Sequence, residues 1–184
     1  MEKNFIIAGF GGQGVLLAGE VLANAFMLDN KNVTWYPSYG AEMRGGTVNC
    51  EIVMNDSEDV SSVNKAETDF IVALNQASFD RFLPKVKKGG WMIANSTLVE
   101  EKKLRDNINY FFAPVTKLAD DLGNVRMTNI LALGVLAKVS GLVSLDTLEQ
   151  ALDNVLPPHR KNLLPLNCKA LKIGYEYDFS LVNS

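Results

Sequence analysis

The sequence predicts an α/β protein of three layers, α/β/α, with a mainly parallel sheet, a Rossmann-like start and at least one antiparallel strand. Three observations lead to this fold class. Apolar runs of strand length alternate with helical patterns along the chain. The first run, Phe5–Ala8, is followed by a glycine-rich turn and an apolar helix at Gly14–Leu28. A later run, Thr47–Met54, alternates apolar and polar residues, which is typical of a strand with one buried face.

The expected elements follow one another without a repeat or a low-complexity linker. The connection at residues 37–46 looks too short for a crossover helix, since parallel strands need about a dozen residues or more between them. The strand that follows it is therefore expected to run antiparallel, near an edge of the sheet. The expected strands are Phe5–Ala8, Val33–Tyr36 (ended by Pro37), Thr47–Met54, Phe70–Leu74, Trp91–Ala94 and Tyr110–Ala113. The expected helices are Gly14–Leu28, Gln76–Val86, Val99–Arg105, Val115–Asp121, Thr128–Val139, Leu145–Val155 and a last one after Pro165.

Size and composition limit what the chain can be. Its 184 residues suffice for one domain with its own core, so we expect a single domain over residues 1–184, with a tail at 175–184 that is flexible or docks on a partner. A formal net charge of −3 offers no basic footprint for nucleic acid and no polybasic membrane patch. The first apolar run is too short for a signal peptide, and no stretch has the length of a membrane span. We expect a cytoplasmic protein with neither nucleic-acid nor membrane partners.

The residues that most often carry catalysis or bind metals are sparse. Cys50 and Cys168 lie far apart and form no CxxC pair, so this chain alone cannot supply a four-ligand zinc or iron–sulfur site. His159 follows two prolines and precedes two basic residues, which favours a surface loop over a general base. The sequence shows neither a nucleophile–base arrangement nor clustered carboxylates. We therefore predict no complete active site and no metal site in this chain.

The first candidate site is the glycine turn. Gly9, Gly11 and Gly14 match GxGxxG between a strand and a helix, where backbone N–H groups and the helix N-terminus attract a phosphate or carboxylate. The same glycines also suit a tight strand–helix turn without any ligand. A nicotinamide cofactor needs an acidic residue at the end of the second strand, and this strand ends Tyr36-Pro37-Ser38. The sequence therefore argues against NAD.

A second glycine-rich stretch runs from Pro37 to Thr47. Its Arg44 stands beside Gly45 and Gly46 and could bind an anion, pair with Glu42 inside the loop, or contact another subunit. Ligands of parallel sheets collect outside the carboxyl ends of the strands. The segments expected at that edge are Gly9–Gly14, Pro37–Gly40, Asn75-Gln76 and Asn95–Thr97.

Taken together, the two loops resemble the gamma subunit of 2-oxoacid:ferredoxin oxidoreductases. The combination of GGQG at Gly11–Gly14 with RGG at Arg44–Gly46 is more specific than GxGxxG. Within the family, the Glu42–Thr47 pattern looks more like the 2-oxoglutarate and branched-chain branches than the pyruvate branch. The likeness continues through Asp69–Asn75, Gly89-Gly90, Asn95-Ser96, Thr128-Asn129, Leu133-Gly134, Asn167–Ala170 and Gly174.

The resemblance implies a non-autonomous subunit of an enzyme that oxidatively decarboxylates a 2-oxoacid to an acyl-CoA, with ferredoxin as the electron acceptor. It implies alpha and beta partner subunits and a ferredoxin-like delta subunit, with thiamine diphosphate and iron–sulfur clusters on those partners. For the isolated chain a homodimer is expected. Coenzyme A is the cofactor that this chain itself is expected to contact, through Gly11, Gly12, Gln13, Gly14, Ser38, Arg44, Gly45 and Asn75. Two alternatives stay open, a stand-alone nucleotide-binding regulatory or redox module and loops that serve assembly alone.

Overall fold

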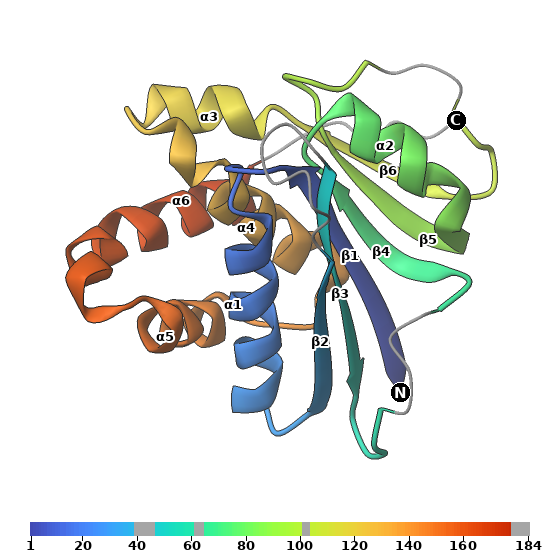
Figure 1. Cartoon of the computed structure of the whole chain (residues 1–184), viewed down its shortest axis with the longest axis horizontal. Helices are drawn as coiled ribbons and strands as arrows, with labels where there is room; N and C mark the ends of the chain where they lie inside the picture. Colours follow the sequence, from blue (N-terminus) through green and yellow to red (C-terminus); the bar gives the residue numbers. More distant parts are fainter. Residues whose placement is uncertain (39–46, 61–64, 101–103, 178–184) are drawn as a thin grey trace.

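Six strands form one sheet in the order β2-β3-β1-β4-β5-β6 (Figure 1). The structure is a computed structural model, and it describes residues 1–38, 47–60, 65–100 and 104–177. Strand β3 pairs antiparallel with both β1 and β2, whereas β1, β4, β5 and β6 are parallel. The expected mainly parallel sheet with an antiparallel strand near one edge is therefore confirmed. The strands are β1 Glu2–Phe10, β2 Asn32–Ser38, β3 Thr47–Asn55, β4 Thr68–Ala73, β5 Val86–Asn95 and β6 Asn109–Ala113.

The described helices form two unequal layers on the two faces of this sheet. One layer holds α1, α3, α4, α5 and α6, and the other consists of α2 (Figure 1). The α-helices are α1 Val15–Leu28, α2 Gln76–Phe82, α3 Val115–Asp121, α4 Thr128–Ser140, α5 Leu145–Val155 and α6 Leu164–Glu176. Short 3-10 turns lie at Leu83–Lys85, Val125–Met127 and Pro158–Leu163. Of the helices in the described ranges, none is long and apolar enough to cross a membrane.

The core is split by the alternation of side chains along the strands. In β1, Phe5 and Ile7 pack into the cluster under α1, whereas Ile6 and Ala8 pack into the cluster under α2. Both clusters are almost fully excluded from solvent, and the larger one includes nearly all of α4. Because β1 is buried on both faces, it reads as a continuous apolar run in the sequence.

Pro37 does not end the second strand, because its position on the sheet edge needs no amide hydrogen. The N–H of Leu74 donates to the carbonyl of Ala8, so the even-numbered residues of β1 bond toward β4 and the odd-numbered ones toward β3. The same alternation continues through the antiparallel register of β1 with β3 and then through that of β3 with β2. The backbone groups of Val33, Trp35 and Pro37 therefore point away from β3. Proline is tolerated at such an outward position of an edge strand.

Two helix predictions also need correction. The helix expected at Gln76–Val86 ends at Phe82, and the chain turns through a 3-10 segment so that β5 begins at Val86. In the span expected as a helix at 99–105, the described residues Val99, Glu100, Leu104 and Arg105 are not helical, and 101–103 lie outside the described residues. Arg105 instead donates to the carbonyls of Leu83 and Val86. In the expected tail, α6 continues to Glu176, and residues 178–184 lie outside the described ranges.

Candidate functional site

The glycine turn joins the end of β1 to the start of α1 through Gly11–Gly14. Gly12 has a φ of 97° and Gly14 a φ of 72°, values that L side chains rarely adopt. Gly14 is the N-cap of α1, and no side chain caps this helix. The first helical hydrogen bond runs from the N–H of Ala18 to the carbonyl of Gly14 over 3.1 Å. The N–H groups of the preceding residues have no partner inside the helix, and they give this end a partial positive charge.

Gln13 holds the turn together rather than projecting from it. Its Oε1 accepts from the N–H of Phe10 at 2.6 Å and from Nδ2 of Asn75 at 3.1 Å. Asn75 is 2 % exposed, and its Oδ1 accepts from the N–H of Ser78 at the start of α2. The two amides therefore connect the carboxyl ends of β1 and β4 to the N-terminus of α2.

A third amide extends this connection to β5. Nδ2 of Asn95 donates to the carbonyl of Leu74 at 3.0 Å and to Oγ1 of Thr116 at 2.8 Å. Its Oδ1 accepts from the N–H groups of Thr97 and Thr116. Asn95 is 2 % exposed, so these contacts are shielded from water. The small polar residues at this sheet edge thus fix the positions of the loops.

The other side of the turn is held by α4. Nδ2 of Asn129, in the first turn of α4, donates to the carbonyl of Gly14 over 3.0 Å. A Cβ placed on Gly14 would lie 2.5 Å from that same nitrogen. Gly14 is thus required both for its backbone angle and for the close approach of Asn129.

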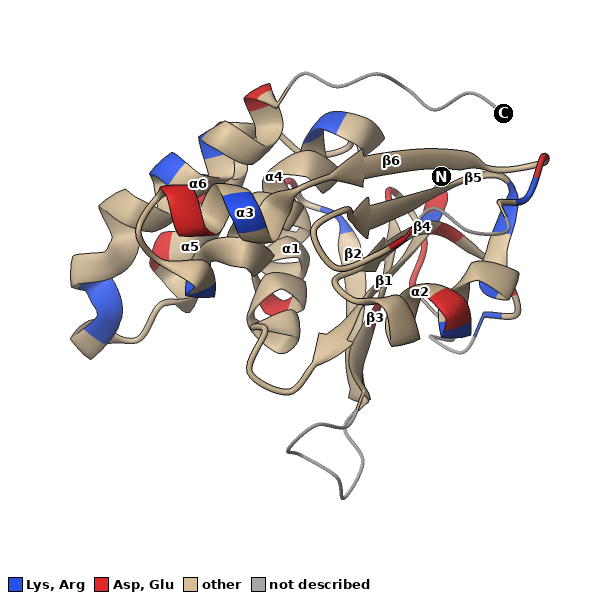
Figure 2. Cartoon of the chain, turned by 90° about the horizontal axis from the view of Figure 1, so that it is seen from above, with Lys and Arg blue, Asp and Glu red and all other residues tan. Residues whose placement is uncertain are grey.

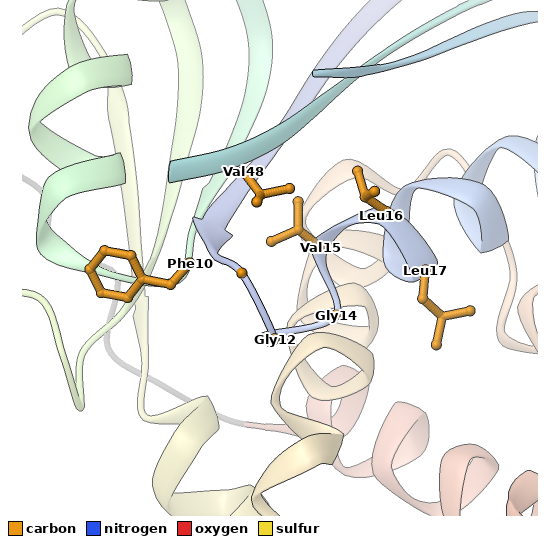
Figure 3. A pocket seen from close by; sticks show the side chains of 8 residues that line it. Phe10, Gly12, Gly14, Val15, Leu16, Leu17 and Val48 are labelled. Carbon is orange, nitrogen blue, oxygen red and sulfur yellow. The ribbon is translucent and has the colours of Figure 1, made fainter. Parts of the chain in front are cut away.

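An open cavity of about 650 Å³ lies beside the turn (Figure 3). Its lining is apolar apart from backbone groups. Val15 and Val48 point toward one another across it, while Phe10 points away toward α2. The lining residues are Phe10, Gly11, Gly12, Gly14, Val15, Leu16, Leu17 and Val48. The cavity therefore offers hydrophobic contact together with the N–H groups at the start of α1.

The structure brings most of the predicted site residues to one edge of the sheet. Gly11 and Gly12 are exposed in the turn, and Ser38 is exposed at the end of β2. Gln13 and Gly14 are half-buried and Asn75 is buried, each in the contacts described above. Arg44 and Gly45 lie outside the described residues. Sequence reasoning missed the apolar lining and Asn129. The alternating pattern of β3 predicted only that Val48 is buried. Nothing in the sequence placed Asn129 at the turn.

Among the described residues, charged side chains and the thiol of Cys50 are not part of the cavity lining. Lys and Arg are interspersed with Asp and Glu over the described helices and loops (Figure 2). Cys50, under α1, is buried and directs Sγ at the carbonyl of Val15 over 3.6 Å. Burial raises the pKa of the Cys50 thiol to about 12, against a smaller opposing effect of Trp35, so the group stays a neutral thiol. Across the described ranges, nowhere do three or more His, Cys, Asp or Glu side chains gather as metal ligands do.

Fold and site define a three-layer α/β protein whose glycine turn presents a helix N-terminus beside an apolar cavity. The family model for pyruvate ferredoxin/flavodoxin oxidoreductase matches residues 4–177. The chain belongs to this family. Within the family it is a gamma-type subunit of the oxoacid:ferredoxin oxidoreductases, and the oxidoreductase is the complex to which such a subunit belongs. The resemblance drawn from the two loops is confirmed.

Three relatives illustrate the placement. The 2-oxoglutarate synthase subunit KorC of Methanothermobacter marburgensis is 36% identical over 89% of this chain and 92% of its own length. The gamma subunit of keto/oxoacid ferredoxin oxidoreductase from Geobacter sulfurreducens has a TM-score of 0.81 at 30% identity, over 95% of this chain and 96% of its own. The 2-oxoglutarate:ferredoxin oxidoreductase of Magnetococcus marinus, solved with 2-oxoglutarate, coenzyme A and succinyl-CoA bound, has a TM-score of 0.85 at 20% identity. That match covers 94% of this chain and 30% of the other, and it supports the fold alone.

Proposed function

We propose that the chain is the gamma subunit of a 2-oxoglutarate:ferredoxin oxidoreductase, which oxidatively decarboxylates 2-oxoglutarate to succinyl-CoA and passes the electrons to ferredoxin. The observation that carries this substrate is the 36% identity to a KorC subunit over nearly the whole of both chains. The Glu42–Thr47 pattern supports the same branch and leaves 2-oxoisovalerate as the second candidate. We propose that residues 1–184 act as one domain of this assembly.

The proposal assigns the redox cofactors to partner subunits. An iron–sulfur cluster is held by four ligands, usually cysteines, and this chain has two cysteines in total. Alpha, beta and ferredoxin-like delta subunits are proposed to carry the clusters and thiamine diphosphate, and the ferredoxin acceptor meets the complex there. The gamma chain contributes a scaffold surface and a contact to coenzyme A.

Coenzyme A is proposed to bind at the glycine turn. Its phosphates fit the partial positive charge at the start of α1, where Gly11 and Gly12 leave the backbone exposed. Its apolar parts fit the cavity lined by Val15, Leu17 and Val48. Gln13 and Asn75 act indirectly, since their amides already bind each other and the backbone of the turn. When bound, coenzyme A supplies the thiol that accepts the acyl group, and this chain orients it.

The experiment is reconstitution. The purified complex is supplied with coenzyme A and ferredoxin, and ferredoxin reduction is followed with 2-oxoglutarate, 2-oxoisovalerate or pyruvate as the substrate. We expect the highest kcat/KM with 2-oxoglutarate, no turnover by the gamma chain alone, and recovery when gamma is added back to a gamma-depleted complex. Turnover by the isolated chain, or a preference for another 2-oxoacid, contradicts the assignment.

A stand-alone nucleotide-binding module is the second candidate, favoured by the GxGxxG turn alone. Strand β2 ends at Ser38, where a dinucleotide site would place an acid for the ribose hydroxyls. Titration of the isolated chain with NAD, FAD and coenzyme A separates the two candidates. Micromolar affinity for NAD with none for coenzyme A would support the module.

A further inference from the structure

Strand β2 lies at one end of the sheet and has a partner strand on one side only (Figure 1). It packs against β3 and α1, whereas α2 on the opposite face packs against β1 and β4. None of the residues of β2 is buried, in contrast with β4, where every residue is. The outer edge of β2 is therefore accessible along the strand.

The backbone of this edge offers hydrogen bonds that the chain itself does not use. The N–H and carbonyl groups of Val33 and Trp35 point away from β3, and among the described residues they have no hydrogen-bond partner. A row of such unpaired groups is a template for a further strand.

The sequence of β2 gives this edge little protection against pairing. Edge strands that stay unpaired usually carry charged side chains, most often lysine, or prolines. Strand β2 reads Asn-Val-Thr-Trp-Tyr-Pro-Ser and has no charged residue. Pro37 lacks an N–H at the last outward position only, so Val33 and Trp35 keep theirs. The β-branched and aromatic residues of this strand are those that favour pairing.

We propose that β2 pairs antiparallel with β2 of a second copy of this chain, about a two-fold axis at Thr34. Val33 then lies opposite Trp35 of the second copy, and Trp35 lies opposite its Val33. Outward-pointing residues that face each other exchange both of their backbone hydrogen bonds. Every N–H and carbonyl of Val33 and Trp35 thus finds a partner, and the two sheets join into one.

The neighbouring registers pair the edge less completely. A shift in one direction places Val33 opposite Pro37, which has no N–H to donate. A shift in the other direction places Trp35 opposite Lys31, whose N–H already donates to the carbonyl of Phe26 over 3.0 Å. The register centred on Thr34 is the one in which both outward residues meet complete partners.

The side chains of β2 suit a second copy of the same strand. A two-fold contact places each residue opposite its symmetry partner, so a charged strand would oppose like charges. Here Thr34 faces Thr34 of the second copy, and Val33 packs beside Trp35, pairs that stabilise antiparallel sheets. Tyr36, which is 55% exposed, lies opposite Asn32. The inference goes beyond the proposed function, because it does not depend on the 2-oxoacid that the complex uses.

Disulfide trapping of the full chain tests the register. Opposed residues that share no hydrogen bonds in an antiparallel pair have Cα atoms about 4.5 Å apart, within the range of a disulfide. In a Cys168→Ser background, with Cys50 buried, we expect Thr34→Cys to form an interchain disulfide under mild oxidation. Tyr36→Cys is the matched control, since position 36 is more exposed but lies away from its symmetry partner. Equal cross-linking of the two variants would indicate random collision and would overturn the proposal.

A proline substitution tests the hydrogen bonds. Val33→Pro removes an N–H that no bond within the chain uses, whereas Thr34→Pro removes one that faces β3. We expect sedimentation velocity to show that the dimer dissociation constant rises at least about tenfold for Val33→Pro. At dilutions where both proteins are monomeric, its melting temperature should stay near that of the wild type, and Thr34→Pro should lower it. An unchanged dissociation constant for Val33→Pro contradicts the proposal.

The oligomeric state of the wild type decides between occupants of the edge. We expect the full chain to be a dimer that dissociates on dilution. A chain that stays monomeric at the highest concentration that remains in solution overturns the proposal. If Val33→Pro then weakens binding of the monomeric chain to its partner subunits, the edge receives a strand from a partner subunit instead of a second copy.

Discussion

Asn129 donates from Nδ2 to the carbonyl of Gly14 over 3.0 Å, and this bond fastens the first turn of α4 to the turn that opens α1. The two residues are 115 positions apart in the chain. A tertiary contact therefore fixes the glycine turn, whose shape local sequence alone does not determine. Loss of the hydrogen bond between Asn129 and Gly14 should therefore lower the stability of the fold, whether or not a ligand is bound.

Gly14→Ala tests this contact. The alanine would keep the unfavourable positive φ of this position, and its Cβ would lie 2.5 Å from Nδ2 of Asn129. The backbone alone should cost about 1–2 kcal/mol, and the close approach should add to that loss. Gly141→Ala is the matched control, since Gly141 has a φ of 62° with nothing within 4 Å of a Cβ. Urea unfolding should show a larger loss for Gly14→Ala, and equal losses would mean that Asn129 moves aside freely.

Gln13 provides a second prediction, because Gln13→Glu keeps the acceptor Oε1 of the side chain and removes the donor Nε2. Gln13→Leu leaves the N–H of Phe10 and Nδ2 of Asn75 without their acceptor, so the free energy of unfolding should fall by about 1–3 kcal/mol. Gln13→Glu retains an oxygen for both donors, but it replaces Nε2 by a carboxylate oxygen that faces the carbonyl of Leu74 in place of the 3.4 Å bond. Because two acceptors repel each other, denaturant unfolding should place Gln13→Glu between the wild type and Gln13→Leu. Similar losses for both variants would refute the assigned role of Oε1.

The alternation of strand-length and helical patterns was enough to predict the layers. The short connection at residues 37–46 was enough to predict that β3 runs antiparallel, because a parallel crossover needs about a dozen residues or more. The edge role of Pro37 was not predictable in the same way. It depends on which backbone groups of β2 face outward, and this follows only from its register with β3. The segment from Val99 to Arg105 has a helical pattern, yet Arg105 is engaged by the carbonyls after α2, a contact that no local pattern encodes.

The candidate site was predicted by position better than by role. Parallel strands bring their carboxyl ends to one edge, so Gly11, Ser38 and Asn75 could be placed together from the sequence. The sequence could not show that Asn75 is buried and saturated by Gln13 and Ser78, because both contacts arise from neighbouring elements. The apolar cavity was missed for a related reason, since a partly exposed valine on β3 has the same pattern as a buried one.

Cys50 should make stability fall at high pH. Its folded-state pKa is raised from 9.0 to about 12 by burial, so the unfolded chain loses this proton first as the pH rises. Ionisation then favours the unfolded state. The contribution of the buried neutral thiol to the free energy of unfolding is complete below pH 9 and is lost between pH 9 and about 12. The free energy of unfolding falls over this range by up to about 1.4 kcal/mol per pH unit. Cys50→Ala should remove this slope while leaving the titrations of Cys168 and Tyr110 in place. Parallel stability curves for the two proteins from pH 8 to 10.5 would contradict the assignment.

The exposed glycine of the turn gives the sharpest test of the proposed coenzyme A contact. Gly12 has a φ of 97° and nothing within 4 Å of an added Cβ, and Gly123, after α3, has a φ of 80° with equally open surroundings. Alanine at either position should therefore lower the free energy of unfolding by a similar amount, about 1–2 kcal/mol. Only Gly12→Ala should displace a ligand that approaches the backbone at the start of α1. In the assembled complex, we expect the KM for coenzyme A to rise for Gly12→Ala with the KM for the 2-oxoacid unchanged, and neither to move for Gly123→Ala. An unchanged KM for coenzyme A in Gly12→Ala would assign the turn to assembly alone.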